Sequence, residues 1–429
     1  MTGSPTRTAR PWKTAFLAGM ASYLDAAVLI STGTALVLYR PTIGIDDLQF
    51  GLLSSLLTLC FAVGALFGGR LGDRFGRRTV YSVTLVGLIV AMGVMALASS
   101  VPMLFVGVVL AGLAIGADLP VSLALIAEDS PEGQKGRFVA FSAILWLVGI
   151  SASNGLSAVV GGMGELGGRI MFAHVGVVAI VVLLLRMTLP ESPEWLAARA
   201  RRAAQEDGER IDLDSLRRLF RPPFIYALAA TGLFYAAWTI ASNTMGQFSA
   251  LLFTELGGTT IQLFGLIKLV NIPLGLLSGF AFMRIVDTRW RYRWFVVGAV
   301  IQIAAFATPL LFDGALWSLM VMTYAFSVGA AFAGEALFKV WSQELYPTLL
   351  RSTAQGASIA FARIAAAGAA VFIPTLATQN PSSLFVLLTA CIVASSLIGF
   401  LWVRVLPTAP SDAVAGTEDD RRTPAETVG

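Results

Sequence analysis

The sequence has few of the side chains that enzymes use for covalent chemistry and metal binding. Its 429 residues include one histidine and two cysteines, and only 13% are charged. His174, Cys60 and Cys391 all lie within apolar stretches. We therefore expect no disulfide framework, no thiol active site, no metal cluster and no cofactor. A Gly-x-x-x-x-Gly-Lys-Ser/Thr run is also missing, which argues against an ATP-driven pump.

What the sequence has in abundance is apolar residues, which make up 56% of the chain. A soluble fold cannot bury that much apolar surface, but a lipid bilayer can surround it. Several apolar stretches reach the roughly 18 residues that cross a membrane. Such segments must satisfy their own backbone hydrogen bonds, so we expect an all-α membrane protein.

Twelve apolar runs are separated by charged breaks. We expect an N-terminal six-helix bundle over 13–189 and a C-terminal six-helix bundle over 224–405. The predicted helices lie near 13–38, 50–69, 79–99, 102–127, 138–160, 170–189, 224–252, 261–283, 294–312, 315–342, 353–376 and 382–405. Residues 1–12 form a polar N-terminus, 190–223 a charged linker, and 406–429 a polar tail that we expect to be disordered.

The net charge of +4 does not indicate a nucleic-acid partner, because the basic residues lie in loops between the predicted helices. One set of alternate loops contains most of the lysines and arginines, whereas the other shows mainly Arg40 and Arg169. This asymmetry predicts that both termini and the linker are cytoplasmic. The expected location is the bacterial inner membrane, with the lipid bilayer as surroundings.

Two motifs occur once in each half at nearly the same offset. Asp73 and Asp287 are 214 residues apart (287 − 73), and Glu128 and Glu344 are 216 apart (344 − 128). Duplicated six-helix halves place a substrate site at their interface near the bilayer midplane. The two halves complete this design without a partner, so we expect a monomer.

Residues 68–78, Gly-Gly-Arg-Leu-Gly-Asp-Arg-Phe-Gly-Arg-Arg, resemble the loop 2–3 signature of the major facilitator superfamily. Its glycines allow a tight turn and close helix approach. A carboxylate among arginines can latch the two bundles in one state. The candidate gating residues are Gly69, Asp73, Arg74, Gly76, Arg77, Glu128, Arg137, Asp287, Glu344 and Arg351.

Three more stretches resemble the sugar-porter and metabolite:proton symporter branch of that superfamily, with features similar to a bacterial inositol-transporter-like group. They begin at Pro190, Glu128 and Glu344. The resemblance departs at the hexose site. Val108 stands where sugar porters have an arginine, and Glu335 and Lys339 stand where they have a glycine and a tryptophan. The hexose-binding site of sugar porters is therefore not expected in this sequence.

Two acids lie deep in predicted helices and are candidates for proton coupling. Asp25 is about 18 Å into helix 1 at 1.5 Å per residue. Low-dielectric surroundings favour the neutral form of a carboxyl, and the resemblance matches Asp25 to the family's coupling aspartate. Asp118 precedes Pro120 in helix 4. For each acid, a structural role as an ion pair or at a helix kink is the alternative.

Four further charged residues lie at membrane depth. Glu335 and Lys339 share a helix face at i,i+4. They either neutralise each other or open to hold a solute. Lys268 and Arg363 have no acid nearby in sequence, so they either pair with Asp25 or Asp118 across the cavity or bind an anionic substrate.

Amides and aromatic rings complete the candidate substrate site, because amides offer paired donors and acceptors to hydroxyl groups. The candidate substrate-binding residues are Trp146, Asn154, Trp238, Asn243, Gln247, Asn271, Glu335, Lys339 and Arg363. We expect a secondary transporter that moves a small polar solute, a polyol such as inositol or a sugar, with protons by alternating access. The alternatives are an organic acid or zwitterion symporter, a proton-driven drug exporter and a membrane sensor.

Overall fold

A computed structural model describes residues 11–131, 135–189, 191, 196, 220–222, 224–346 and 348–407. Within these residues all regular structure is helical. Twelve spans in the described part are long and apolar enough to cross a membrane. The predicted all-α fold with twelve spanning helices is confirmed. Most of the N-terminus, linker and tail predicted at 1–12, 190–223 and 406–429 lies outside the described residues.

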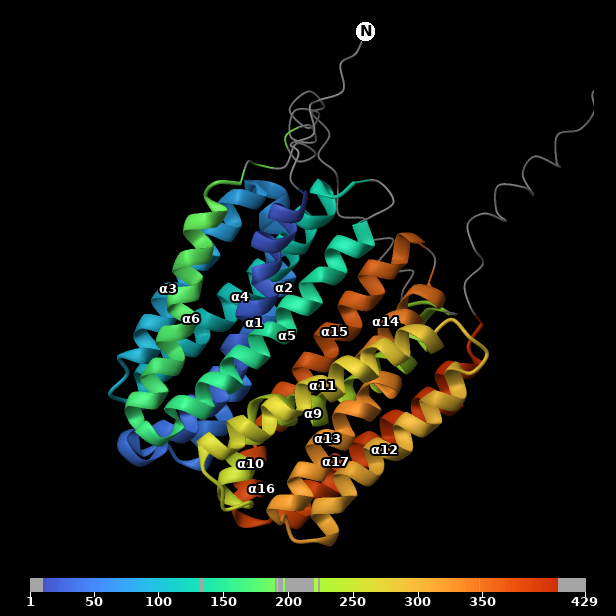
Figure 1. Ribbon diagram of the computed structural model, residues 1–429. Helices are drawn as coiled ribbons and strands as arrows, with labels where there is room; N and C mark the ends of the chain where they lie inside the picture. The colour runs from blue at the N-terminus through green and yellow to red at the C-terminus, as the bar shows by residue number, and fades with distance from the viewer. Residues whose placement is uncertain are drawn as a thin grey trace, which may run out of the picture.

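The N-terminal bundle contains the first six spans (Figure 1). Its elements are α1 (Pro11–Tyr39), η1 (Arg40–Gly44), α2 (Asp47–Phe75), α3 (Arg77–Ala96), α4 (Val101–Asp129), α5 (Lys135–Val160), η2 (Gly161–Met163) and α6 (Glu165–Arg186). Glycines on α2 and α4 allow these two helices to touch along their length. A Cβ on Gly116 would lie 2.1 Å from the Phe61 carbonyl oxygen.

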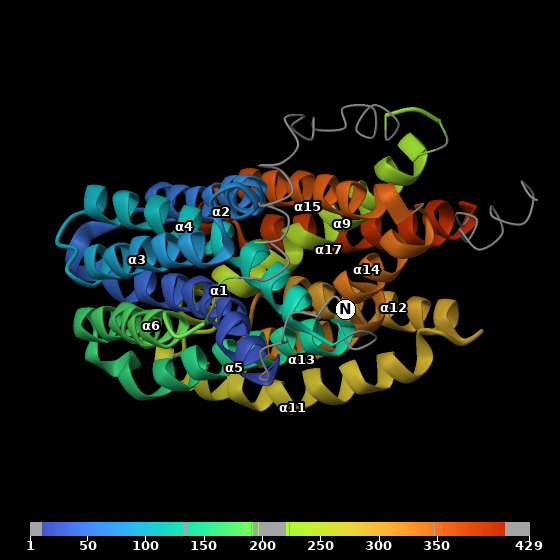
Figure 2. The same cartoon turned by 90° about the horizontal axis from the view of Figure 1, so that it is seen from above.

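The C-terminal bundle contains the other six spans and lies beside the first (Figure 2). Its elements are α9 (Phe224–Gln247), α10 (Ser249–Glu255), α11 (Ile261–Ile285), α12 (Arg291–Leu311), α13 (Leu316–Ala333), α14 (Glu335–Glu344), α15 (Thr348–Ala370), α16 (Ile373–Gln379), α17 (Pro381–Leu397), η3 (Ile398–Trp402) and η4 (Val403–Val405). Helices α5 and α11, and α2 and α15, pack against each other across the two bundles.

Three spans of the C-terminal bundle are discontinuous, although the sequence predicted single helices. The seventh span breaks at Phe248 between α9 and α10, the tenth at Gly334 between α13 and α14, and the eleventh at 371–372 between α15 and α16. A Cβ on Gly334 would lie 2.5 Å from the Ala330 carbonyl oxygen and 2.8 Å from the Trp238 ring, so no side chain fits there. Broken helices of this kind expose backbone groups beside binding sites in transporters.

The predicted loop over 70–78 is wrong, because most of this signature is helical. Helix α2 continues to Phe75 and α3 starts at Arg77. Only Gly76 separates them, with a φ of 96° that favours glycine. The close helix approach is made by Gly68, whose Cβ would lie 2.6 Å from the Ala117 Cα, whereas a Cβ on Gly69 would have no neighbour within 4 Å.

Candidate functional site

A cavity of about 510 Å³ lies between the two bundles. Helices α1 and α5 line it from one bundle, and α9, α11, α13, α14 and α15 line it from the other. Ten of the residues singled out from the sequence line this one cavity: Asp25, Trp146, Asn154, Trp238, Asn243, Gln247, Lys268, Asn271, Glu335 and Arg363. Lys339 and Asp118 are not part of its lining.

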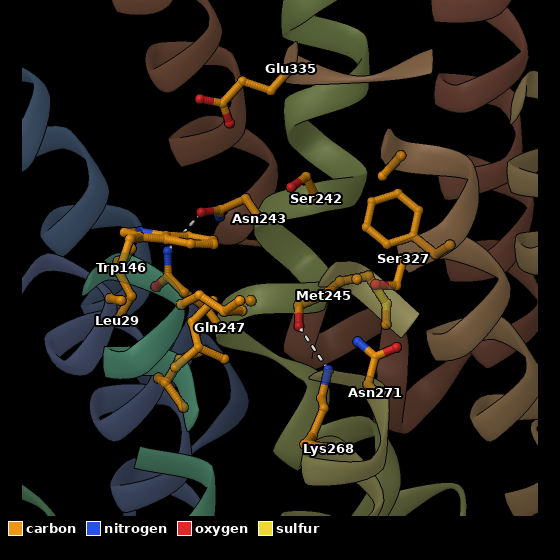
Figure 3. A pocket seen from close by; sticks show the side chains of 18 of the residues that line it. Leu29, Trp146, Ser242, Asn243, Met245, Gln247, Lys268, Asn271, Ser327 and Glu335 are labelled. Atoms are coloured by element: carbon orange, nitrogen blue, oxygen red, sulfur yellow. Dashed lines mark hydrogen bonds between the residues drawn. The ribbon is translucent and has the colours of Figure 1, made fainter. Parts of the chain in front are cut away.

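The cavity is more open at one end. Gln247, at the end of α9, is 1% exposed, whereas the side chain of Glu335, at the start of α14, is 43% exposed. Figure 3 shows these two residues at different levels of the cavity. The opening therefore faces the end of the molecule that α14 approaches, where Glu344 and Arg291 lie. We call this the basic end, and the other the Arg40 end.

Three amide oxygens in the cavity wall have no hydrogen-bond partner in the protein. They are Oε1 of Gln247, Oδ1 of Asn154 and Oδ1 of Asn271. The amide nitrogens of the first two are held: Gln247 Nε2 donates to Thr58 Oγ1 at 2.8 Å and Asn243 Oδ1 at 2.9 Å, and Asn154 Nδ2 donates to the Ile150 carbonyl at 2.9 Å. These oxygens are acceptors without a protein donor on residues that line the cavity, and each oxygen is itself buried in this state.

Aromatic rings form one wall of the cavity. Tyr235 stacks on Trp238 at 6.1 Å and on Phe338 at 4.1 Å between ring centroids. The indole Nε1 of Trp238 donates to Gln302 Oε1 at 2.9 Å, which fixes the ring. Trp146 is 42% exposed and lies on the opposite bundle. These faces suit the apolar side of a ring-shaped solute.

The charged groups of the cavity form two sets. Asp25 is 5% exposed, interacts with Trp146, and lies in the electrostatic field of Arg363 and Glu335. Glu335 forms an ion pair with Lys339 at 2.7 Å, as its i,i+4 spacing predicted. Lys268 forms the second set by itself. Its Nζ donates to Ser249 Oγ at 2.9 Å and approaches the Met245 carbonyl at 3.4 Å.

Asp118 lies outside the cavity in a buried ion pair that the sequence analysis missed. Arg186 Nη1 lies 2.8 Å from Asp118 Oδ1, and both side chains are at most 6% exposed. Arg186 also donates to the carbonyls of Leu17 and Ala18 at 2.7 and 2.8 Å. These contacts join α1, α4 and α6. They agree with the structural alternative for Asp118, and its role in proton coupling stays an untested prediction. The available signal was Arg186, an arginine directly after the apolar run Leu183-Leu184-Leu185.

The candidate gating residues gather at the basic end. Arg77 pairs with Glu128 at 2.8 Å, and Arg291 with Glu344 at 2.6 Å, so each half of the repeat holds an equivalent pair. Asp287 is exposed, and so is Arg74, which lies 5.2 Å from the Phe75 ring. The side chains of Asp73, Arg137 and Arg351 lie outside the described residues.

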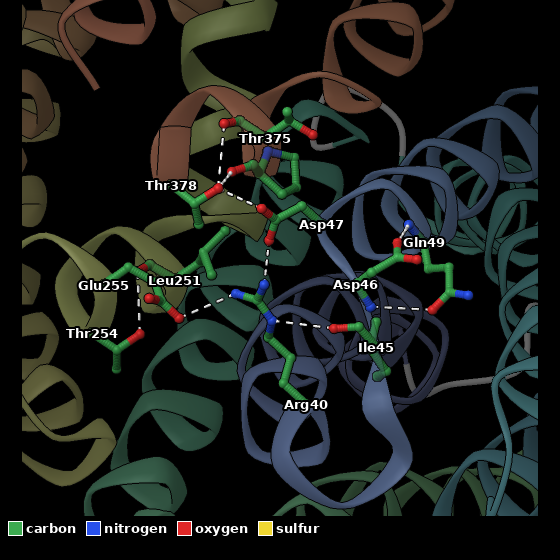
Figure 4. A network of polar contacts seen from close by, with 11 residues as sticks. Arg40, Ile45, Asp46, Asp47, Gln49, Leu251, Thr254, Glu255, Thr375 and Thr378 are labelled. Carbon is green, nitrogen blue, oxygen red and sulfur yellow. Dashed lines mark hydrogen bonds and ion pairs between the residues drawn. The ribbon is translucent and has the colours of Figure 1, made fainter. Parts of the chain in front are cut away.

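The Arg40 end contains a polar network that connects the two bundles (Figure 4). Arg40 forms ion pairs with Asp47 and, at 3.1 Å, with Glu255 on α10. Asp47 also accepts a hydrogen bond from Thr378 on α16. We call Arg40, Asp47, Glu255 and Thr378 the clasp. The sequence analysis did not assign these residues, because each is an ordinary loop residue until the fold brings them together.

The Major Facilitator Superfamily profile matches residues 15–370 of the chain. A minor myo-inositol transporter of Bacillus subtilis (strain 168) is 29% identical over 397 residues, which cover 91% of this chain and 90% of that protein. A niacin transporter of Acinetobacter baylyi is 31% identical over 185 residues, 43% of this chain and 41% of that protein.

Among solved structures, the inward-open conformation of the xylose transporter of E. coli has the same fold. Its TM-score is 0.73 at 17% identity, with 95% of this chain and 99% of that chain covered. The match to the family profile spans most of the sequence and includes the motif at 68–78. The chain is therefore a multi-pass membrane transporter that belongs to the major facilitator superfamily.

Proposed function

We propose that this transporter moves a small polyhydroxylated solute, a polyol such as inositol or a sugar, together with protons. The observation that carries the proposal is the set of three unpartnered amide oxygens, on Gln247, Asn154 and Asn271, around one cavity. Hydroxyl groups of a polyol would donate to these oxygens, and the Trp146 and Trp238 rings would cover its apolar faces. The similarity to a myo-inositol transporter supports the same solute class.

Proton coupling is assigned to Asp25. This carboxyl lines the cavity but is 5% exposed, and its Oδ1 has no hydrogen-bond partner in the protein. Burial of a carboxyl away from water favours its neutral, protonated form. A buried carboxyl with an unpartnered oxygen beside the solute cavity suits a group that gains and loses a proton during transport.

The basic end is the proposed cytoplasmic end, in agreement with the distribution of lysine and arginine among the loops. The cavity then opens towards the cytoplasm, and the clasp closes the opposite face. Arg77–Glu128 and Arg291–Glu344 are the proposed gating pairs, one for each half. Rocking of one bundle against the other would open the Arg40 end and close the basic end.

The test is uptake of labelled myo-inositol by proteoliposomes that contain the purified protein. With the outside more acidic than the inside, the label should accumulate above its external concentration, and a protonophore should abolish the accumulation. A parallel thermal-shift screen against polyols, sugars, organic acids and drugs uses the fact that a ligand of the folded state stabilises it. Stabilisation by apolar drugs alone, with no effect of any polyol or sugar, would contradict the proposed solute class.

A further inference from the structure

Two basic residues of the described cavity lining, Lys268 and Arg363, form no ion pair with a carboxylate of the described residues, and Lys268 contacts neutral groups only. Its Nζ donates to the Ser249 hydroxyl at 2.9 Å and approaches the Met245 carbonyl at 3.4 Å, and its cation lies 5.7 Å from the Phe264 ring. No carboxylate of the described residues lies within ion-pairing distance of it. Figure 3 shows Lys268 close to Met245 and on the far side of the cavity from Glu335.

The other charges of the lining do not pair with it. Glu335 is matched by Lys339 at 2.7 Å. The Arg363 guanidinium lies 4.9 Å from the Phe61 ring and forms no ion pair with a described carboxylate. The four charged residues of the lining, Asp25, Glu335, Lys268 and Arg363, balance when Asp25 is ionised. When Asp25 is neutral, the lining has one excess positive charge.

We propose that Lys268 forms a carboxylate-binding subsite, and that the solute is a polyhydroxylated acid of the sugar-acid class. A carboxylate at Lys268 would form a charge-assisted hydrogen bond, which is shorter and stronger than a bond between neutral groups. Asn271, one helical turn along α11, lines the same cavity and has a free amide oxygen for an adjacent hydroxyl. This inference rests on the proposed function and narrows its solute class.

A purely structural role is the alternative for Lys268, and it predicts a different effect of Lys268 substitutions on charged and neutral solutes. Met245 and Ser249 flank the break between α9 and α10, so an ammonium group there also braces the broken helix. A brace would affect every solute equally, because it acts on the shape of the cavity. A subsite would affect only solutes that bear a negative charge. Comparison of matched charged and neutral solutes therefore separates the two roles.

The experiment measures binding of two matched pairs to the purified full-length transporter. Glucuronate and glucose share a ring and differ at one carbon, and nicotinate and nicotinamide differ by a carboxylate against a carboxamide. The wild-type protein should bind glucuronate at least about tenfold more tightly than glucose. Nicotinate, which has a carboxylate but no hydroxyl groups, should bind more weakly than glucuronate.

Three variants complete the test. Lys268→Gln should lower glucuronate affinity about tenfold and leave glucose within about twofold, and Lys268→Arg should retain the preference for the acid. Lys13→Gln removes a positive charge outside the cavity, where Lys13 contacts Thr188 at 2.9 Å, and should change nothing.

Two results would overturn the subsite. These are equal binding of glucuronate and glucose by the wild type, or equal weakening of both by Lys268→Gln. Tighter binding of nicotinate than of glucuronate would overturn the sugar-acid class of the solute. The affinities of the wild-type protein for glucuronate and glucose test the subsite even if the variants fail to fold. Binding of glucose or inositol without any preference for the acid would leave the proposed function intact. Failure of inositol, glucose and glucuronate to bind at all would contradict the proposed function itself.

Discussion

At the scale of single residues, the two buried acids of the N-terminal bundle have different surroundings. Asp118 forms an ion pair with Arg186 and accepts a hydrogen bond from Ser122 at 3.1 Å. Asp25 lies in the cavity wall with one oxygen unpartnered. Asp118 is thus committed to an ion pair that joins three helices, whereas Asp25 lies beside the solute cavity. We therefore propose Asp25 rather than Asp118 as the proton-coupling residue.

Breaking the Asp118–Arg186 pair should destabilise the protein strongly, because the remaining charge stays buried. Arg186→Met should cost about 3–5 kcal/mol, seen as a large fall in the apparent melting temperature in detergent. The double variant Asp118→Asn/Arg186→Met should recover part of the loss, since no charge is then left unpaired. If the double variant were as unstable as the sum of the single variants, the two residues would not interact.

The residues that the sequence predicted for the cavity share a property visible without a structure. Asn154, Asn271 and Glu335 are polar groups within apolar runs, and the bilayer forces such groups towards the interior. Arg186 has the same property but lies at the end of its run, where an arginine usually reaches the membrane surface. Only the packing of α6 against α1 and α3 directs it inwards, where it reaches Asp118 on α4.

At the scale of helices, glycine positions decide how closely α2 and α4 approach. A Cβ on Gly68 would lie 2.5 Å from the Ala117 carbonyl oxygen, whereas one on Gly69 would meet nothing within 4 Å. The sequence showed both glycines in one motif and could not tell them apart. The difference arises because adjacent positions on a helix point about 100° apart and only one faces α4.

Gly68→Ala should therefore be harmful and Gly69→Ala tolerated. Overpacking in a tight contact typically costs about 1–3 kcal/mol, so Gly68→Ala should lower both the yield of folded protein and its apparent melting temperature. Gly69→Ala is the control with the same chemical change. Equal stability of the two variants would show that α2 and α4 do not approach as closely as described.

The clasp at the Arg40 end should stabilise the state in which that end is closed. Arg40→Gln removes both of its ion pairs, each contributing up to about 1 kcal/mol at an exposed position, and should shift the conformational equilibrium several-fold. Spin labels at Thr42 and Gln379, placed in a variant without Cys60 and Cys391, would report a larger population of longer distances.

Arg169→Gln provides the matched control at the same end of the molecule. Arg169 pairs at 2.6 Å with Glu165 on its own helix, so its loss should leave the label distances unchanged. Exchange of charges in Arg40→Glu/Glu255→Arg should restore part of the closed population. If the distances between the spin labels were unchanged in Arg40→Gln, the clasp would have no role in gating.

At the scale of the whole molecule, the duplication was the feature most accessible from sequence. The offset between motifs predicted two equivalent halves, and the structure holds Arg77–Glu128 and Arg291–Glu344 as equivalent pairs. The break at Phe248 could not be predicted, because hydropathy continues across it without a charged residue, and the break at Gly334, directly before Glu335, was not predicted either. They result from packing against neighbours such as the Trp238 ring.

The proposed orientation of the molecule rests on the asymmetry of lysine and arginine and has a direct test. Reporter domains that are active only outside the cytoplasm should be inactive when fused within the 199–218 segment or after Gly429. The same reporters inserted next to Thr42, at the Arg40 end, should be active. Activity of a fusion within 199–218 would reverse the assignment of the two ends.

The central claim is that solute and proton cross together through the cavity beside Asp25. The most direct measurement uses proteoliposomes with a pH-sensitive dye inside and no imposed gradient. Addition of myo-inositol or glucuronate outside should acidify the interior with wild-type protein. With Asp25→Asn, which mimics the protonated carboxyl, labelled solute should still exchange across the membrane but without acidification. Acidification by Asp25→Asn equal to that of the wild type would contradict the account.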